Sequence, residues 1–164
     1  MSPAARSPRT LAVFCSGEGT NLRAILRAIS GRKLRARVAV VVSDSPKAGA
    51  LKKAKQAGVP TVVVKRSDFS SRDAFDKALS KKVERFGARL IVLAGFMRVL
   101  SPWFVRKYAG RILNIHPALL PAFPGANGLQ DALDHGVKVT GVTIHFVDRK
   151  VDHGPILLQE AIRI

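Results

Sequence analysis

Near its N-terminus the chain reads Leu11-Ala-Val-Phe-Cys15, then Ser16-Gly-Glu-Gly-Thr-Asn21, then Leu22-Arg-Ala-Ile-Leu-Arg-Ala-Ile29. The first segment is a continuous apolar run of strand length, and the third carries apolar residues at helical spacing. The glycines between them permit a tight turn. A buried strand, a glycine-rich loop and a helix in this order predict the first unit of an α/β sheet.

The same alternation continues along the chain. Further apolar strands are predicted at Val38–Val42, Thr61–Val64, Arg89–Ala94 and Ile112–Ile115, and helices at Ala48–Ala57, Ser71–Phe86, from Ser101 onward and near Gly128–Leu133. Continuous apolar strands are typical of a parallel sheet covered by helices on both faces. The last two strands, Val139–Val147 and Pro155–Ile164, are separated only by a turn, so we expect them to pair antiparallel. The predicted fold is a doubly wound, mostly parallel Rossmann-like α/β sheet with an antiparallel C-terminal edge.

Length and composition predict one globular domain over residues 1–164, with residues 1–10 as a flexible basic lead. The lead lacks the apolar core of a signal peptide, no apolar run reaches membrane-spanning length, and the single cysteine, Cys15, excludes a disulfide framework. We therefore expect a cytoplasmic protein with no membrane partner. The chain ends on a strand with no covering helix after Ile164, so it looks truncated, and its open edge favours a homodimer.

The charge is strongly positive and uneven. Lys and Arg number 28 against 11 Asp and Glu, a net charge of +17, and most of the excess lies in residues 1–82. A basic half attracts polyanions. The densest cluster lies at Arg32–Arg37 and is followed by the basic residues of Lys52–Arg66, and neither stretch contains an aromatic side chain on which bases could stack. A solvated surface is the simpler interpretation, and we expect no nucleic-acid partner.

The loop of Gly17, Glu18, Gly19, Thr20 and Asn21 is the first candidate site. Backbone N–H groups at the start of a helix favour an anion, and Thr20 or Asn21 can cap the helix. Leu22 occupies the position where a dinucleotide fingerprint needs a small residue, and no phosphate-binding lysine follows. A generic phosphate cradle and a purely structural turn both remain open from these residues.

The second candidate is Asn114-Ile-His116, at the end of a predicted strand. Asn114 and His116 alternate with apolar neighbours, so they point to the same side. A carboxamide can donate to a developing oxyanion while an imidazole moves a proton. Taken as an isolated pair, a hydrogen-bonded core histidine and a turn-forming asparagine are the favoured structural interpretation. Asp152 lies in a later turn and could orient a histidine, although Asp-x-Gly is also ordinary turn chemistry.

The other chemistry-bearing residues support no separate site. The histidines and aspartates match no compact metal-ligand spacing, so we expect no metal. A structural role is predicted for His145, which stands in an apolar strand, and burial for Cys15. Since no nucleophile is assembled, direct attack between two bound substrates fits better than covalent catalysis.

Four motifs, taken together and in their order along the chain, resemble those of one known enzyme family. Ser16–Leu22, Val92-Leu-Ala-Gly-Phe-Met-Arg98, Leu113-Asn-Ile-His-Pro-Ala-Leu-Leu-Pro121 and Val151-Asp-His-Gly-Pro155 resemble the phosphoribosylglycinamide formyltransferase family. The resemblance runs from about Leu11 to Ile164. It implies a purine-biosynthesis enzyme that transfers a formyl group from 10-formyltetrahydrofolate to the amine of glycinamide ribonucleotide, with no metal.

The resemblance also implies roles at matching positions. Asn114, His116 and Asp152 would be catalytic, and the Gly17–Asn21 loop would hold the substrate phosphate. The folate pocket would be lined by two segments, comprising Met97, Arg98, Val99 and Leu100, and Val147, Asp148, Val151 and Asp152.

Departures from related patterns define the alternatives. Pro117 stands where formyltetrahydrofolate hydrolases have a second histidine, and Ala122–Gly125 where methionyl-tRNA formyltransferases have a tryptophan-containing basic element. Asn127 and Gln130 replace a usual His and Arg of the resembled family. The open alternatives are the hydrolase, a non-catalytic folate-binding fragment, and a basic nucleic-acid-binding domain.

Overall fold

The protein is described here by a computed structural model that covers residues 9–164. One seven-stranded sheet runs through it in the order β3-β2-β1-β4-β5-β6-β7. Its strands are β1 (Arg9–Cys15), β2 (Ala36–Ser43), β3 (Thr61–Val63), β4 (Leu90–Leu93), β5 (Ile112–His116), β6 (Val139–Phe146) and β7 (Ile156–Arg163). The first five strands are mutually parallel, while β6 runs antiparallel to both β5 and β7. This confirms the predicted doubly wound sheet with an antiparallel C-terminal edge.

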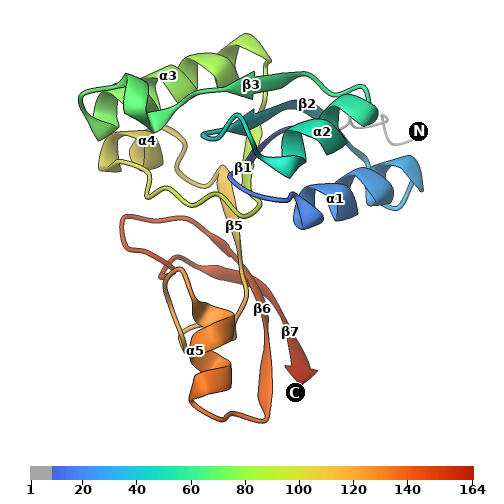
Figure 1. The fold of residues 1–164 in the computed structure, drawn as a ribbon, viewed down its shortest axis with the longest axis vertical. Coiled ribbons are helices and arrows are strands. Elements are labelled where there is room, and N and C mark those ends of the chain that lie inside the picture. The colour runs from blue at the N-terminus through green and yellow to red at the C-terminus, as the bar shows by residue number, and fades with distance from the viewer. Residues whose placement is uncertain (1–8) are drawn as a thin grey trace, which may run out of the picture.

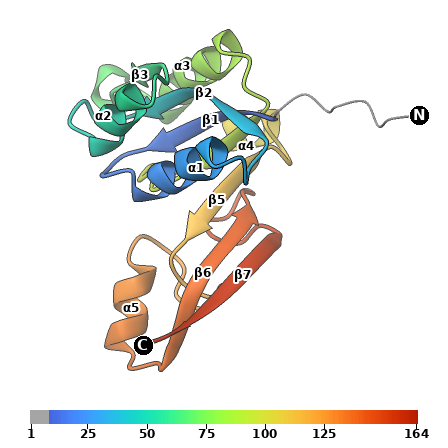
Figure 2. The same ribbon diagram turned by 90° about the vertical axis from the view of Figure 1, so that its right-hand side faces the viewer.

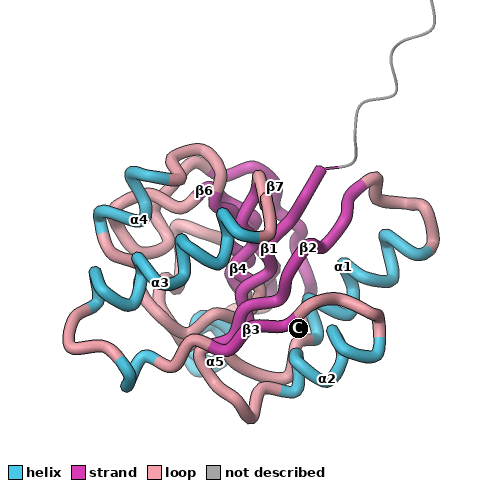
Figure 3. Tube along the Cα trace, turned by 90° about the horizontal axis from the view of Figure 1, so that it is seen from above, coloured by secondary structure: helices cyan, strands magenta, loops and turns pink. Residues whose placement is uncertain are grey.

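Helices cover both faces of the parallel strands, as Figure 3 shows from above. The helices are α1 (Thr20–Ser30), α2 (Gly49–Gln56), α3 (Arg72–Arg85), α4 (Pro102–Lys107) and α5 (Gly128–Asp134), with a short 3₁₀ turn at Arg66–Asp68. α1 and α2 pack on one face and α3 and α4 on the other. Alternate residues of β1 therefore enter different cores: Ala12 and Phe14 face α3 and α4, whereas Val13 and Cys15 face α1 and α2.

The C-terminal strands form a second, thinner region. Figures 1 and 2 show β5 leading from the layered body into a lower part where α5 lies along one face of β6 and β7. All eight residues of β7 are exposed. The prediction of a strand here is confirmed, and both its free edge and its apolar side chains face solvent among the described residues.

The lead is shorter than predicted. We expected residues 1–10 to be flexible, but Arg9 and Thr10 already belong to β1 and pair with Ala36 and Arg37 of β2. The sheet's hydrogen bonding extends two residues past the apolar run, where side-chain pattern alone gives no signal. Residues 1–8 lie outside the described part.

Serine caps fix two of the helices. The Ser71 side chain accepts a hydrogen bond from the Ala74 amide at the start of α3, and the Ser101 side chain accepts from Phe104 at the start of α4. The backbone amide of Ser101 donates to the buried Asp76 carboxylate of α3, and burial raises the pKa of that carboxyl above its usual value. These contacts join α3 to α4 and thereby anchor the loop that precedes α4.

Candidate active site

The centre of the site lies where β5 ends. Asn114 and His116 occupy alternate positions of β5, so both side chains leave the same face of the sheet. His116 is buried, and Asn114 is half-buried. The predicted placement of this pair on one side of a strand terminus is confirmed. Open α/β sheets bind ligands at the carboxyl-terminal ends of their strands, where this pair lies.

Asp152 reaches this pair from the turn between β6 and β7. Its Oδ1 accepts a hydrogen bond from Asn114 Nδ2 at 3.2 Å, and its Oδ2 accepts one from the Gly125 amide at 2.8 Å. The same Oδ2 lies 3.4 Å from His116 Nδ1. Asp152 adopts a left-handed backbone conformation, with φ at 50°, which Asp tolerates better than most residues. The fold thus brings together the three residues that sequence reasoning assigned to catalysis.

The hydrogen-bond partners of His116 show which of its ring nitrogens carries a hydrogen. Its Nε2 lies 2.7 Å from the backbone oxygen of Phe123, and a carbonyl can only accept, so Nε2 carries a hydrogen. Nδ1 faces the Asp152 carboxylate, which also can only accept when ionised. This contact becomes a hydrogen bond when the ring carries its second proton. The arrangement is therefore suited to stabilising an imidazolium next to the carboxylate.

His145 is a member of the cluster that sequence reasoning missed. Its Nδ1 lies 2.9 Å from the Phe146 carbonyl, which can only accept, so this nitrogen carries a hydrogen. Its Nε2 is then free to accept from Asn114 Nδ2, at 3.1 Å. The antiparallel register places His145 directly opposite Asn114. Because the neighbours of His145 in the sequence are apolar, its pattern indicated only a buried strand. Its contact with Asn114 depends on the pairing of β5 with β6.

Asn114 is consequently held from both sides. The two hydrogens of its Nδ2 point to His145 Nε2 and Asp152 Oδ1. A carboxamide held this way has a fixed orientation, which is what an electrostatic donor to a developing oxyanion requires.

The candidate phosphate loop follows β1, which lies two strands from β5, and it is found at the same carboxyl-terminal end of the parallel strands. The structure corrects one expectation here, because neither Thr20 nor Asn21 caps the helix: the cap residue is Gly19, and α1 has no side-chain cap. Gly19 adopts φ 73°, and a Cβ built on it would lie 2.7 Å from the Cα of Ala50, so glycine is required for both conformation and space. The first-turn amides of α1 are therefore not engaged by a capping side chain. Glu18 in this loop lies 3.7 Å from the Lys53 ammonium, which offsets its charge.

The two candidate folate segments are the loop after β4, residues 97–100, and the connection from β6 to β7, residues 147–152. The Met97 amide donates to the Ser16 hydroxyl, which ties the loop after β4 to the phosphate loop, and Val147 packs against the core that contains Leu100. Met97, Val99 and Val151 are large apolar side chains left mostly exposed. Exposed apolar groups on these two segments offer a surface for a flat, largely apolar ligand.

Three predicted lining residues have other contacts. Leu100 is buried in the core, so its side chain faces away from solvent. Arg98 forms an ion pair with the nearly buried Asp44, with 2.5 Å between Nε and Oδ2. The Asp148 carboxylate is hydrogen-bonded to His153 on the exposed turn, and this bond lowers the pKa of Asp148. Asp44 follows β2 directly, in a stretch from Ser43 to Gly49 that resembles family sequence, but sequence reasoning assigned it no role.

Cys15 is buried in the core beneath α1, as predicted. Burial raises the pKa of its thiol to about 12, so the reactive thiolate is scarce at neutral pH. We expect iodoacetamide at pH 8 to leave Cys15 unmodified in the folded chain and to modify it fully in denaturant. Mass spectrometry of the intact chain measures both states. Rapid alkylation without denaturant would contradict the buried placement.

Neither a metal centre nor a membrane-spanning helix is found within residues 9–164. No group of three or more His, Cys, Asp or Glu side chains there is arranged to hold a metal ion. Over the same range, every helix is too short or too polar to cross a bilayer.

Comparisons with known proteins point to one family. The family model described as formyl transferase matches residues 9–164. The phosphoribosylglycinamide formyltransferase of Escherichia coli K12 is 42% identical over 154 residues, which is 94% of this chain and 73% of that protein. The trifunctional purine biosynthetic protein adenosine-3 of Gallus gallus is 47% identical over 154 residues, and there the chain spans only 15% of the relative's length.

Solved structures agree with the sequence relatives. Glycinamide ribonucleotide transformylase 1 from Symbiobacterium toebii superposes with a TM-score of 0.94 at 45% identity, covering 97% of this chain and 75% of that one. The phosphoribosylglycinamide formyltransferase of Bacillus halodurans gives a TM-score of 0.92 at 39% identity, covering 95% and 80% respectively. With the family model matched over nearly the whole chain, the chain belongs to the formyl transferase family, in its phosphoribosylglycinamide formyltransferase group.

Proposed function

We propose that the chain transfers a formyl group from 10-formyltetrahydrofolate to the primary amine of glycinamide ribonucleotide in purine biosynthesis. The observation that carries this proposal is the Asn114–His116–Asp152 cluster at the end of β5, in a chain of this family. The folate supplies an activated formyl carbon. The bond that forms joins the amine nitrogen to that carbon, and the bond that breaks joins the carbon to the folate nitrogen.

The residues of the cluster have complementary parts in this reaction. Asn114 Nδ2 would donate to the oxyanion of the tetrahedral intermediate by exchanging one of its two present acceptors, His145 Nε2 or Asp152 Oδ1. His116 would add a positive charge beside this neutral donor when its ring is protonated, with the Asp152 carboxylate 3.4 Å from its Nδ1. Asp152 also lies where it can take up the proton that the attacking amine loses, which must finally reach the departing folate nitrogen.

The remaining predicted residues are proposed for binding. The loop Gly17, Glu18, Gly19, Thr20 and Asn21, with the uncapped start of α1, would hold the ribonucleotide phosphate. Met97, Val99 and Val151 would contact the folate through their exposed side chains, together with Val147 and the backbone around Arg98 and Leu100. Asp148 and Asp152 would contribute polar contacts from the turn.

A formyl-transfer assay on the 164-residue chain tests the proposal. Both substrates are combined, release of the deformylated folate is followed by absorbance, and a control omits the ribonucleotide. Release that requires the ribonucleotide supports the transferase. Release in the control alone identifies a hydrolase, and bound folate without release identifies a non-catalytic folate-binding protein. Either of these two results overturns the proposal.

The homodimer and the cytoplasmic location remain predictions. The fully exposed β7 supports the first, because a free strand edge with apolar side chains favours pairing with another chain. Sedimentation equilibrium would contradict it by giving a single monomer mass at all concentrations.

A further inference from the structure

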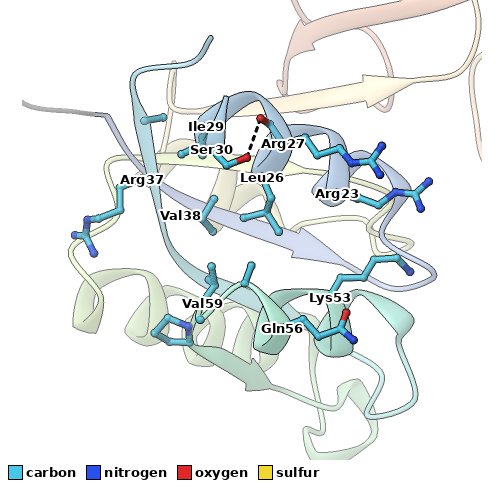
Figure 4. A pocket seen from close by; sticks show the side chains of 14 residues that line it. Arg23, Leu26, Arg27, Ile29, Ser30, Arg37, Val38, Lys53, Gln56 and Val59 are labelled. Carbon is cyan, nitrogen blue, oxygen red and sulfur yellow. Dashed lines mark hydrogen bonds between the residues drawn. The ribbon is translucent and has the colours of Figure 1, made fainter. Parts of the chain in front are cut away.

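A hollow between α1 and α2 belongs to none of the elements assigned above to catalysis. Its volume is about 630 Å³, and it is lined by residues of α1, β2 and α2 and by the segment that follows α2. Figure 4 shows the hollow from close by. No residue of the Asn114–His116–Asp152 cluster lines it.

Positive charge surrounds this hollow. Arg23, Arg27, Arg37 and Lys53 all line it, and no Asp or Glu does. Among the described residues, no carboxylate lies within ion-pair distance of Arg23, Arg27 or Arg37. Residues 20–66 as a whole contain twelve Lys and Arg but only one carboxylate, that of Asp44, which is already paired with Arg98. Of the four lining cations, Lys53 alone has a carboxylate nearby within the described residues, since Glu18 lies 3.7 Å from its ammonium. The three arginines therefore give the hollow a net positive potential.

The floor of the hollow is apolar. Leu26 and Ile29 of α1, Val38 of β2 and Val59 after α2 contribute to it. In Figure 4, Arg37 lies at the opposite end from Arg23 and Lys53, with Leu26 and Val38 between them. A ligand that satisfies this surface needs apolar groups in the middle and anionic groups toward both ends.

The combination of surrounding cations and an apolar floor favours some classes of anionic ligand over others. No aromatic side chain occurs anywhere in residues 20–66, so nucleic-acid bases have nothing to stack on. A phosphate backbone would meet the cations but would leave the apolar floor empty. An amphipathic peptide can fill it, because helical spacing presents apolar side chains on one face with carboxylates beside them.

We propose that the α1–α2 hollow is a docking site for an acidic amphipathic segment of a partner protein. The apolar side chains of the segment would pack on Leu26, Val38 and Val59, and its carboxylates would pair with Arg23, Arg27, Arg37 and Lys53. Complementary charge would speed the encounter, and burial on the apolar floor would hold the complex.

The test uses a fluorescein-labelled 14-residue peptide of Leu and Glu at helical amphipathic spacing, followed by fluorescence anisotropy. Polyglutamate of equal charge and a 20-base-pair DNA duplex are the comparison ligands. Two variants of the chain separate charge from shape. Arg27→Glu with Arg37→Glu reverses cations of the hollow, whereas Ala57→Trp adds bulk at its exposed lining without changing charge.

A matched control carries the same change in net charge on the other face of the sheet. Lys81→Glu with Arg85→Glu lies on exposed positions of α3. We expect the peptide to bind the wild type, with about a tenfold or greater loss of affinity for the hollow variants, a change below about twofold for the control, and weaker binding of polyglutamate and DNA. The proposal is overturned by no peptide binding, by equal losses in the control, by unchanged affinity in Ala57→Trp, or by equal or tighter binding of either comparison ligand.

Discussion

Replacing Asp152 with Asn is expected to lower kcat by about a thousandfold while leaving the fold intact. This magnitude is within the range for loss of a positioned proton-transfer group. The carboxylate accepts hydrogen bonds from Asn114 Nδ2 and the Gly125 amide and faces His116 Nδ1. An Asn side chain has one accepting oxygen, so in either orientation its NH₂ group would meet the donor of Asn114 or that of Gly125. The negative charge that stabilises a protonated His116 is also lost.

The fold should survive this change. Asn has nearly the same volume as Asp and also tolerates a left-handed backbone, so the φ of 50° at this position is not an obstacle. Circular dichroism and thermal unfolding check the fold, and steady-state kinetics separates kcat from KM. Asp134→Asn is the matched control, since Asp134 lies exposed on α5 and undergoes the same loss of charge. A kcat for Asp152→Asn within tenfold of the wild type would remove Asp152 from the mechanism.

Local pattern was sufficient for most of the architecture. The apolar runs predicted each of the seven strands to within a few residues. For β1, β2 and β4 the reason is that their central residues are buried on both faces, which leaves no polar positions there to break the run. The helices followed from their spacing and from signals such as Ser71 and Ser101, whose side chains do cap α3 and α4. The antiparallel edge followed from the short connection between β6 and β7.

Contacts between residues distant in the sequence were not found by sequence reasoning. His145 enters the candidate site because β6 pairs with β5, a contact between segments 31 residues apart that no local period encodes. Arg98 and Asp44 are 54 residues apart in the sequence, so no local pattern predicts their ion pair either. The missed cap of α1 has a different origin. A left-handed Gly19 begins the helix by backbone conformation alone, and the polar side chains beside it offered a plausible but unused alternative.

The candidate site was found from a different kind of information. Spacing alone placed Asn114 and His116 on one side of a strand, and the structure puts the Asp152 carboxylate against both. Asp152 lies 36 residues beyond His116 in a turn whose sequence is ordinary turn chemistry. Asp152 was selected because of the family resemblance. Its position near Asn114 and His116 depends on the antiparallel pairing of β6 with β5 and β7, which places the β6–β7 turn at the end of β5.

Asn114→Ala is expected to lower kcat by about a hundredfold to a thousandfold, the usual cost of removing one donor to an oxyanion. Alanine removes the carboxamide whose two hydrogens are held by His145 Nε2 and Asp152 Oδ1. Because that donor acts on charge that develops during the reaction, the affinity for a non-reactive folate analogue should change less than about threefold. Calorimetric titration measures this affinity, and the assay described above measures kcat.

Two further variants make the Asn114 result specific. Asn114→Asp places a second carboxylate about 3.2 Å from Asp152, so repulsion adds to the loss of the donor and kcat should fall at least as far as in Asn114→Ala. Gln130→Ala removes an exposed carboxamide that contacts only Asp134 on α5, and it should retain wild-type kcat. If Asn114→Ala kept wild-type kcat, or if it lost kcat and folate affinity in equal measure, Asn114 would be a structural or binding residue, because a donor that acts only in the transition state lowers kcat without weakening the ground-state complex.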